Sequence, residues 1–103
     1  MNMKTAKRIK VEPVGTILLE EFIKPLGLTQ YRVAKDCGIP HPTMTQIIKG
    51  RRSLSVTNAL RLARYFGTTA QFWINLQTDY DLRMARGEFK KIQREVQPLK
   101  RAA

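Results

Sequence analysis

The chain has 103 residues, of which 43% are hydrophobic, and a formal net charge of +11. This length accommodates one domain with a short tail, and the ordinary apolar fraction excludes wholesale disorder. One cysteine excludes an internal disulfide, and one cysteine with one histidine cannot fill a zinc site that needs four Cys/His ligands. We therefore expect no metal and no cofactor, and the basic excess favours a polyanion as partner.

The chain carries no pattern that predicts a membrane attachment. No apolar run approaches the roughly 18 residues that span a bilayer, and the basic residues 1–10 lack the apolar stretch of a signal peptide. We expect a cytoplasmic protein without a membrane partner. Residues 1–12 show no sustained periodicity, and we interpret them as a flexible basic arm.

Apolar residues at helical spacing predict an all-α domain over 13–86, with five helices and no strand. The expected helices cover about 14–24, 30–37, 41–49, 56–66 and 70–86. Hydroxyl side chains that can cap an N-terminus precede three of them, at Thr29, Ser55 and Thr69. Glycines that tolerate a left-handed backbone end three of them, at Gly38, Gly50 and Gly67.

The apolar residues of each expected helix recur at helical spacing, as two of the helices illustrate. We expect the inner face of 41–49 to contain Met44, Ile47 and Ile48, and that of 56–66 to contain Ala59, Leu60, Ala63 and Phe66. The end of the last helix is set by Gly87, which is unfavourable in a helix by about 1 kcal/mol relative to alanine. We therefore expect that helix to end near Arg86, and residues 87–103 to form a partly disordered extension.

The second and third expected helices have the spacing of a helix-turn-helix motif. A short helix at 30–37, a glycine-containing turn at 38–40 and a second short helix at 41–49 match that plan. The second helix fits a DNA major groove about 12 Å wide. The alternative is an ordinary helix pair whose polar face is simply solvated.

The residue types around this second helix favour DNA recognition. Threonine and glutamine can hydrogen-bond to base edges, and glutamine can pair with adenine through two bonds. We expect bases to be read by His41, Thr43, Thr45 and Gln46. Basic and amide side chains nearby can hold phosphates, which fixes the register of the protein on DNA. We expect these contacts from Gln30, Lys49, Arg51 and Arg52.

Other chemistry-bearing residues have a simpler interpretation. His41 is the only histidine, so we interpret it as a polar residue beside DNA rather than as a catalytic or metal-binding group. Cys37 lies on an apolar stripe and is expected in the core. Ser53 and Ser55 have no neighbouring base, and capping explains them better. We find no paired carboxylates in a plausible cleft, no phosphate loop and no nucleophile–base pair, and we expect no enzyme.

An aromatic cluster on the last helix has two interpretations. Phe72, Trp73 and Tyr80 could pack against the preceding helix, or they could anchor a dimer, because tryptophan and tyrosine are enriched among interface anchors. In a mixed arrangement, Phe72 and Leu76 are core while Trp73 and Tyr80 face a partner. Dimers of such domains read two half-sites about 34 Å apart.

Several segments resemble the HigA family of antitoxins. The run GTTAQFWINLQTDYDL at 67–82 is similar to the C-terminal signature of that family, and ALRLARYF at 59–66 precedes it. The similarity covers about 13–86. The resemblance implies a five-helix Cro/lambda-repressor-like fold and a homodimer. It also implies an antitoxin that neutralises a HigB-type mRNA-cleaving toxin and represses the shared operon by binding double-stranded operator DNA.

The contact surface for such a toxin stays open among three candidates. RNA-cleaving toxins need basic surfaces, so acidic patches are natural docking points. Glu20 and Glu21 are one candidate, Asp79 and Asp81 another, and the basic arm at 1–12 a third. Two other functions stay open: a stand-alone phage-like repressor without a toxin, and a non-specific architectural DNA binder.

Overall fold

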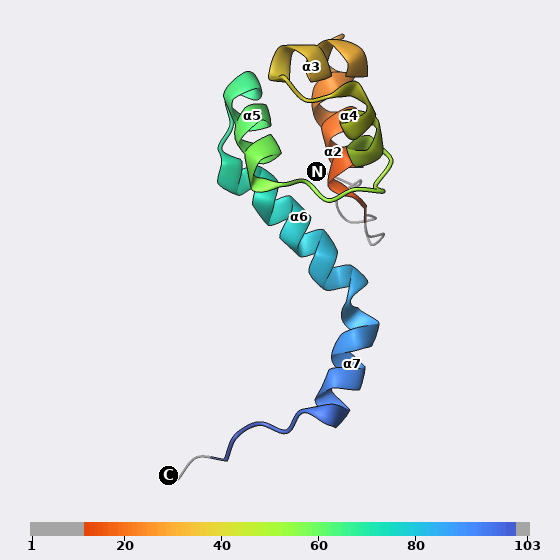
Figure 1. Cartoon of the computed structure of the whole chain (residues 1–103), viewed down its shortest axis with the longest axis vertical. Helices are drawn as coiled ribbons and strands as arrows, with labels where there is room; N and C mark the ends of the chain where they lie inside the picture. Colours follow the sequence, from red (N-terminus) through yellow and green to blue (C-terminus); the bar gives the residue numbers. More distant parts are fainter. Residues whose placement is uncertain (1–11, 101–103) are drawn as a thin grey trace, which may run out of the picture.

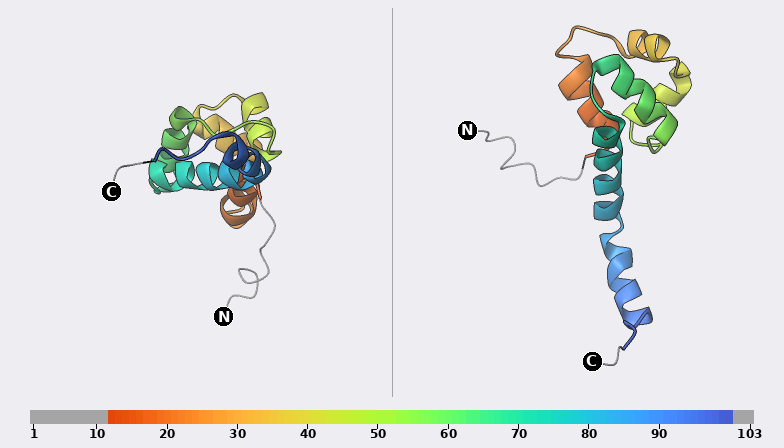
Figure 2. Two further views of the ribbon diagram at one scale, coloured as in Figure 1. Left: turned by 90° about the horizontal axis from the view of Figure 1, so that it is seen from below. Right: turned by 90° about the vertical axis from the view of Figure 1, so that its left-hand side faces the viewer.

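The computed structural model describes residues 12–100, where helices are joined by short connecting segments. In chain order the helices are α2 (Val14–Ile17), η1 (Leu18–Ile23), α3 (Gln30–Cys37), α4 (His41–Ile48), α5 (Val56–Phe66), α6 (Ala70–Met84) and α7 (Arg86–Glu95). Residues 12–80 form a rounded head, and residues 81–95 leave it as a stalk (Figure 1). The principal extents are 57 × 34 × 25 Å, and two further views show the same elongation (Figure 2).

The predicted capping residues are confirmed. The hydroxyls of Thr29, Ser55 and Thr69 each accept the backbone N–H three residues further on, at 3.0–3.1 Å. Each hydroxyl thereby satisfies a donor that has no partner within the helix. Gly38 and Gly67 end α3 and α5 with φ angles of 71° and 73°. The bounds of α3 and α5 therefore coincide with the predicted 30–37 and 56–66.

The first helix differs in form from the α-helix expected at 14–24. After a short α-helical start it widens into the π-helix η1, and Lys24 N donates to Leu19 O at 3.0 Å, five residues back. Leu18 and Ile23 are 0% and 1% exposed. Their separation matches a π-helical turn, whose hydrogen bonds also join residues five apart. Burial of both side chains therefore explains the change, which a 3.6-residue pattern does not predict.

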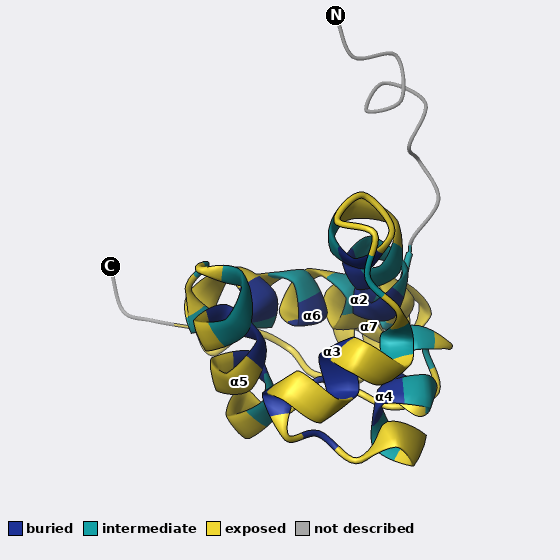
Figure 3. Cartoon of the chain, turned by 90° about the horizontal axis from the view of Figure 1, so that it is seen from above, coloured by how far each residue is buried: buried dark blue, intermediate teal, exposed yellow. Residues whose placement is uncertain are grey.

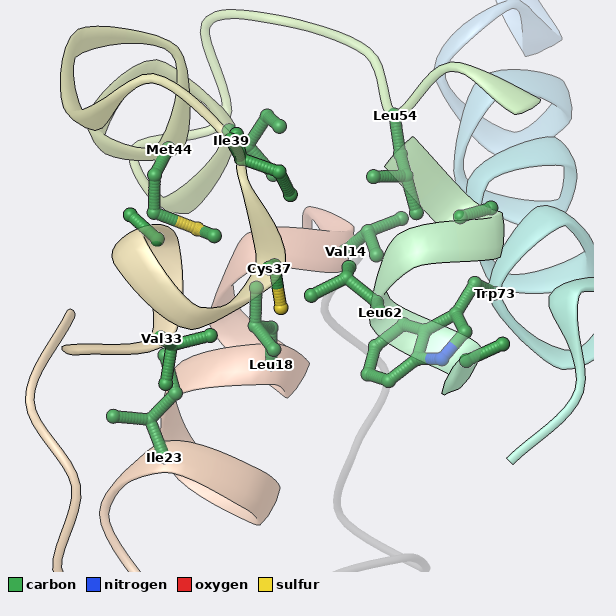
Figure 4. Packing of buried hydrophobic residues seen from close by; sticks show 14 residues of the cluster. Val14, Leu18, Ile23, Val33, Cys37, Ile39, Met44, Leu54, Leu62 and Trp73 are labelled. Carbon is green, nitrogen blue, oxygen red and sulfur yellow. The ribbon is translucent and has the colours of Figure 1, made fainter. Parts of the chain in front are cut away.

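The core takes side chains from every described helix except α7, and Figure 4 shows how they pack together. On α5 the buried residues are Ala59, Leu62 and Ala63, whereas Leu60 is 57% exposed. The expectation that Leu60 faces inward was wrong, because it lies about 100° around the helix from Ala59. On α4 Met44 and Ile47 are buried, as predicted, and Ile48 is half-buried.

Trp73 is the centre of the aromatic cluster and not a surface anchor. Its side chain is 0% exposed, and its ring centroid lies 4.9 Å from that of Phe22 and 5.0 Å from that of Phe72. The indole N–H donates to Thr68 Oγ1 at 2.8 Å, which satisfies its polar atom. The expectation that Trp73 faces a partner was wrong, since α6 turns it into the head and leaves Phe72 37% exposed.

The C-terminal part contains one more helix than expected. α6 ends at Met84, and α7 follows after a single residue, Ala85, whose φ and ψ are −90° and 9°. The extension that we expected to be partly disordered is thus helical as far as Glu95, in spite of Gly87. Residues 1–11 of the predicted arm and residues 101–103 lie outside the described residues. None of the described helices is long and apolar enough to cross a membrane.

A close approach between the backbones of α2 and α4 requires glycine at position 15. A Cβ atom on Gly15 would lie 2.0 Å from the carbonyl oxygen of Ile47 and 2.4 Å from the Cα atom of Ile48. Both neighbours are backbone atoms, so no side chain can move aside. Gly15 therefore sets how deeply α4 sits against α2.

We predict that Gly15→Ala lowers the free energy of unfolding by about 1–3 kcal/mol, because added volume in a packed interface forces the backbones apart. Urea unfolding followed by circular dichroism measures the change. Gly87→Ala is the matched control, because nothing lies within 4 Å of a Cβ atom there. The control is expected to be neutral or slightly stabilising. Equal stability of Gly15→Ala and the native chain would contradict the packing argument.

Candidate nucleic-acid interface

The helix-turn-helix arrangement of α3 and α4 is present in the structure. The turn at residues 38–40 begins with the left-handed Gly38, and Ile39 anchors it in the core with 3% exposure. Pro42 lies in the first turn of α4, where a missing N–H costs nothing. Figure 3 shows exposed residues on the outer turns of α3 and buried residues where it faces its neighbours. The motif therefore presents one side of α4 outward on a fixed support.

The four predicted base-reading residues lie on α4, and they differ in exposure. His41 and Gln46 are exposed, whereas Thr43 and Thr45 are half-buried. The buried residues of α4, Met44 and Ile47, hold the inner side of the helix in the core. The structure thus leaves His41 and Gln46 the freest of the four to approach a base. The role of all four on DNA stays a prediction.

Gln30 joins the start of α3 to the outer side of α4. Its amide Nε2 donates to Thr45 Oγ1 at 2.5 Å and lies 3.4 Å from His41 Nε2. The exposed ring of Tyr31 lies 5.7 Å from the His41 ring. Thr45 keeps its own O–H as a donor, because its oxygen is the acceptor in this bond. Gln30 therefore orients two predicted base-reading residues, a role that its position in the sequence did not reveal.

The basic connector, residues 49–53, follows α4 directly. Lys49, Arg51 and Arg52 are all exposed, and the left-handed Gly50, with φ 74°, turns the chain between them. Arg51 N donates to Gln46 O at 2.9 Å, so the connector is bonded to the last turn of α4. Three cations therefore flank the predicted reading helix, where phosphates would lie if that helix entered a major groove.

Gln77 is a positioning residue that the sequence pattern did not single out. Its side chain is 9% exposed, its Oε1 accepts from Leu54 N at 2.8 Å, and its Nε2 donates to Asp81 Oδ1 at 2.9 Å. Leu54 follows the basic connector, so Gln77 ties that connector to α6. The helical spacing of α6 could have predicted that Gln77 is buried, because it lies one helical turn after Trp73 and so shares its side of the helix.

The remaining chemistry-bearing groups near the motif are structural. Cys37 is 6% exposed, as predicted for a core residue, and burial together with the charge of Asp36 raises the pKa of its thiol to about 11. Hydrogen bonds from Tyr65 and Arg32, at 2.7 Å each, lower the pKa of Asp36. Within residues 12–100 no group of three or more His, Cys, Asp or Glu residues is arranged to hold a metal ion.

The residues expected to contact protein partners lie on η1 and α6. Glu20 and Glu21 are exposed on η1, and Glu20 accepts from Lys24 at 2.9 Å. Tyr80 is half-buried and lines a small cavity with Pro13 and Arg52 of its own chain. A role for Tyr80 in a dimer therefore stays a prediction.

The fold and the exposed side of α4 define a helix-turn-helix protein. A family model described as helix-turn-helix matches residues 19–73. The chain is 42% identical over 78 residues to virulence-associated protein I of Dichelobacter nodosus, covering 76% of this chain and 72% of that protein. It is 34% identical over 97 residues to antitoxin HigA-1 of Vibrio cholerae, covering 94% of this chain and 90% of that protein.

A solved structure leads to the same family. The Pseudomonas aeruginosa antitoxin HigA, solved with the higBA promoter, superposes with a TM-score of 0.83 at 35% identity, covering 88% of this chain and 100% of that one. The chain belongs to the HigA family of helix-turn-helix antitoxins.

We predict that Gln77→Leu lowers the free energy of unfolding by about 1–3 kcal/mol, because the buried Leu54 N–H loses its acceptor. Gln71→Leu is the matched control, since Gln71 is exposed on the same helix and donates to Asn75 at 2.7 Å one turn away. Chemical denaturation of both variants compares the two losses. A similar effect of both substitutions would show that the bond to Leu54 does not position the connector.

Proposed function

We propose that this chain is an antitoxin that represses its own operon by sequence-specific DNA binding and neutralises a HigB-type mRNA-cleaving toxin. One observation supports the DNA-binding part. The inner side of α4 is buried, while its outer side exposes His41 and Gln46 beside an exposed connector with two arginines. A rigid polar helix flanked by cations suits a major groove bordered by phosphates.

In the proposed complex a homodimer inserts two copies of α4 into successive major grooves. Base edges are read by His41, Thr43, Thr45 and Gln46. Phosphates on either side are held by Gln30, Lys49, Arg51 and Arg52. The P. aeruginosa antitoxin that shares this fold was solved with promoter DNA, which supports the same use of the motif here.

We predict that Gln46→Ala weakens binding to the chain's own promoter by about 1–3 kcal/mol and relaxes specificity at one base position. The loss of hydrogen bonds to a base edge is the physical cause. Fluorescence anisotropy with promoter variants at that position measures both effects. An equal loss on promoter and random duplex would exclude a base-reading role for Gln46.

We predict a different signature for Arg51→Ala, because a phosphate contact carries no sequence information. Affinity should fall to a similar degree on promoter and random duplex, and the slope of log affinity against log salt should decrease by about one unit. A salt titration of the native chain and the variant on both duplexes measures this. A loss confined to the promoter would instead make Arg51 a base-reading residue.

The proposed toxin surface lies on η1, apart from the DNA-reading side of α4. Glu20 and Glu21 are exposed there, in a chain whose net charge is +11. A basic ribonuclease would find in them a complementary patch. Because the two surfaces use different residues, neutralisation and repression can occur in one complex. Asp79 and Asp81 on α6 are the second acidic candidate.

We predict that replacing both glutamates, Glu20→Lys with Glu21→Lys, weakens binding to the protein encoded by the adjacent gene by about tenfold or more, because like charges then meet at the interface. Promoter affinity should stay within about a factor of two. Co-purification followed by calorimetry provides the measurement. Unchanged affinity for the neighbouring protein eliminates this patch, and absence of any such complex favours the stand-alone repressor.

A further inference from the structure

One end of the Gln30 side chain faces two predicted base-reading residues at once. Its Nε2 atom donates to Thr45 Oγ1 at 2.5 Å and lies 3.4 Å from His41 Nε2. Gln30 begins α3, whereas His41 and Thr45 lie one helical turn apart on α4, and Figure 3 shows the two helices side by side. Because one amide group serves both contacts, the hydrogen-bonding roles of the two α4 side chains are coupled.

The amide can satisfy this pair of contacts in two orientations. With its NH₂ group toward α4 it donates two hydrogen bonds, and both Thr45 Oγ1 and His41 Nε2 must accept. With its carbonyl toward α4 the oxygen accepts two hydrogen bonds, and both Thr45 and His41 must donate. Each orientation makes the same number of bonds, so a small difference in free energy decides between them. A mixed arrangement, with one donor and one acceptor on α4, leaves one contact unsatisfied.

The charge of His41 provides such a difference. A neutral imidazole can accept at Nε2 and carry its proton on Nδ1, whereas the charged ring donates from both nitrogens. A donor at Nε2 cannot bond to the NH₂ group of Gln30, so protonation selects the carbonyl orientation. Histidine changes its charge between about pH 5 and pH 8. His41 is exposed to solvent and is the only histidine in the chain.

Within residues 12–100, the ring of His41 has a hydrogen bond or ring contact only with Gln30 and Tyr31. α4 packs against α2, which carries no titratable side chain, and against α3. Tyr31 is the titratable residue of α3 that faces His41, with 5.7 Å between the ring centroids. The other titratable residues of α3, none of which has a hydrogen bond or ring contact with His41, are Arg32, Lys35, Asp36 and Cys37.

The orientation of the amide determines which group Thr45 has left for DNA. In the NH₂ orientation the Thr45 oxygen is the acceptor, and its O–H is free to donate. In the carbonyl orientation the O–H is used, and only a lone pair of the oxygen is left. In the major groove guanine and thymine present a keto oxygen, whereas adenine and cytosine present an amino group. A donor at Thr45 therefore favours a keto base, and an acceptor favours an amino base.

We propose that the charge of His41 selects the class of base that Thr45 reads, with Gln30 as the positioning residue between them. With His41 neutral, Thr45 donates to guanine or thymine. With His41 charged, Thr45 accepts from adenine or cytosine. The inference rests on the proposed DNA-binding function and adds to it a base preference that changes with pH.

The base preference at two pH values tests the proposal with the full chain. Fluorescence anisotropy gives the affinity for the chain's own promoter, and for variants that exchange guanine with adenine or thymine with cytosine, at about pH 5.5 and about pH 8. At one position of each half-site the ratio of keto to amino affinity should fall by about three- to tenfold on acidification, since one hydrogen bond changes partner. Taking the ratio removes the general effect of added positive charge, which acts on all duplexes alike.

Two substitutions separate this coupling from a merely structural role of Gln30. Gln30→Glu presents only acceptors, so it should give the acid preference of the native chain at both pH values. Its negative charge lowers the affinity for every duplex, which the ratio again removes. Gln30→Met has a similar length without hydrogen-bonding groups, and its base preference should not depend on pH. A native-like pH dependence in both variants would overturn the proposal.

NMR of the free chain follows the amide without DNA. Nuclear Overhauser contacts between the Gln30 NH₂ protons and the Thr45 methyl group should weaken on acidification, with the midpoint of the His41 ring titration. Gln71, which is exposed and donates to Asn75 on its own helix, is the control and should not change.

The outcomes separate this inference from the proposed function. Contacts of Gln30 that stay constant while His41 titrates, or a keto-to-amino ratio that is equal at both pH values, overturn the inference alone. Equal affinity for promoter and random duplex rejects the proposed function instead. The NMR titration then still decides whether His41 and Gln30 are coupled, because it needs no DNA.

Discussion

The absence of a side chain at Gly15 is the constraint on which the motif depends. The backbone of α2 meets the last turn of α4 so closely that a Cβ atom would lie 2.0 Å from the Ile47 carbonyl oxygen. Contacts between two backbones do not adapt by rotamer changes, so the close approach at Gly15 fixes the position of α4 relative to α2. A helix that reads bases must be held in this way, because base-edge hydrogen bonds tolerate little displacement.

Two polar side chains connect α4 and the connector that follows it to neighbouring helices by hydrogen bonds. Gln30 links the start of α3 to Thr45 and His41, and Gln77 links α6 to the end of the basic connector at Leu54. The bonds of Gln30 therefore hold polar side chains on the outer side of α4, and the bond of Gln77 holds the end of the connector that carries the arginines. Gln77 also donates to Asp81, the first residue of the stalk. One side chain therefore contacts both the end of the connector and the start of the stalk.

The sequence predicts local structure well where one residue decides it. Thr29 and Ser55 begin helices because their hydroxyls accept free backbone N–H groups, and Gly38 ends one because it adopts a left-handed backbone. The exposed side of α4 follows equally from its apolar period. Other features depend on tertiary contacts and escape a periodic pattern. Burial of both Leu18 and Ile23 favours a π-helix, and Trp73 is buried with its ring 4.9 Å from that of Phe22.

The account is tested most directly by a dimethyl sulfate footprint of the native chain on its own promoter, because this reagent methylates guanine N7 in the major groove. If α4 is the reading helix of a symmetric dimer, protection appears in two clusters about one helical turn apart on one side of the duplex. Strong binding without protection of any major-groove guanine, on a promoter with guanines throughout the bound region, would contradict the account.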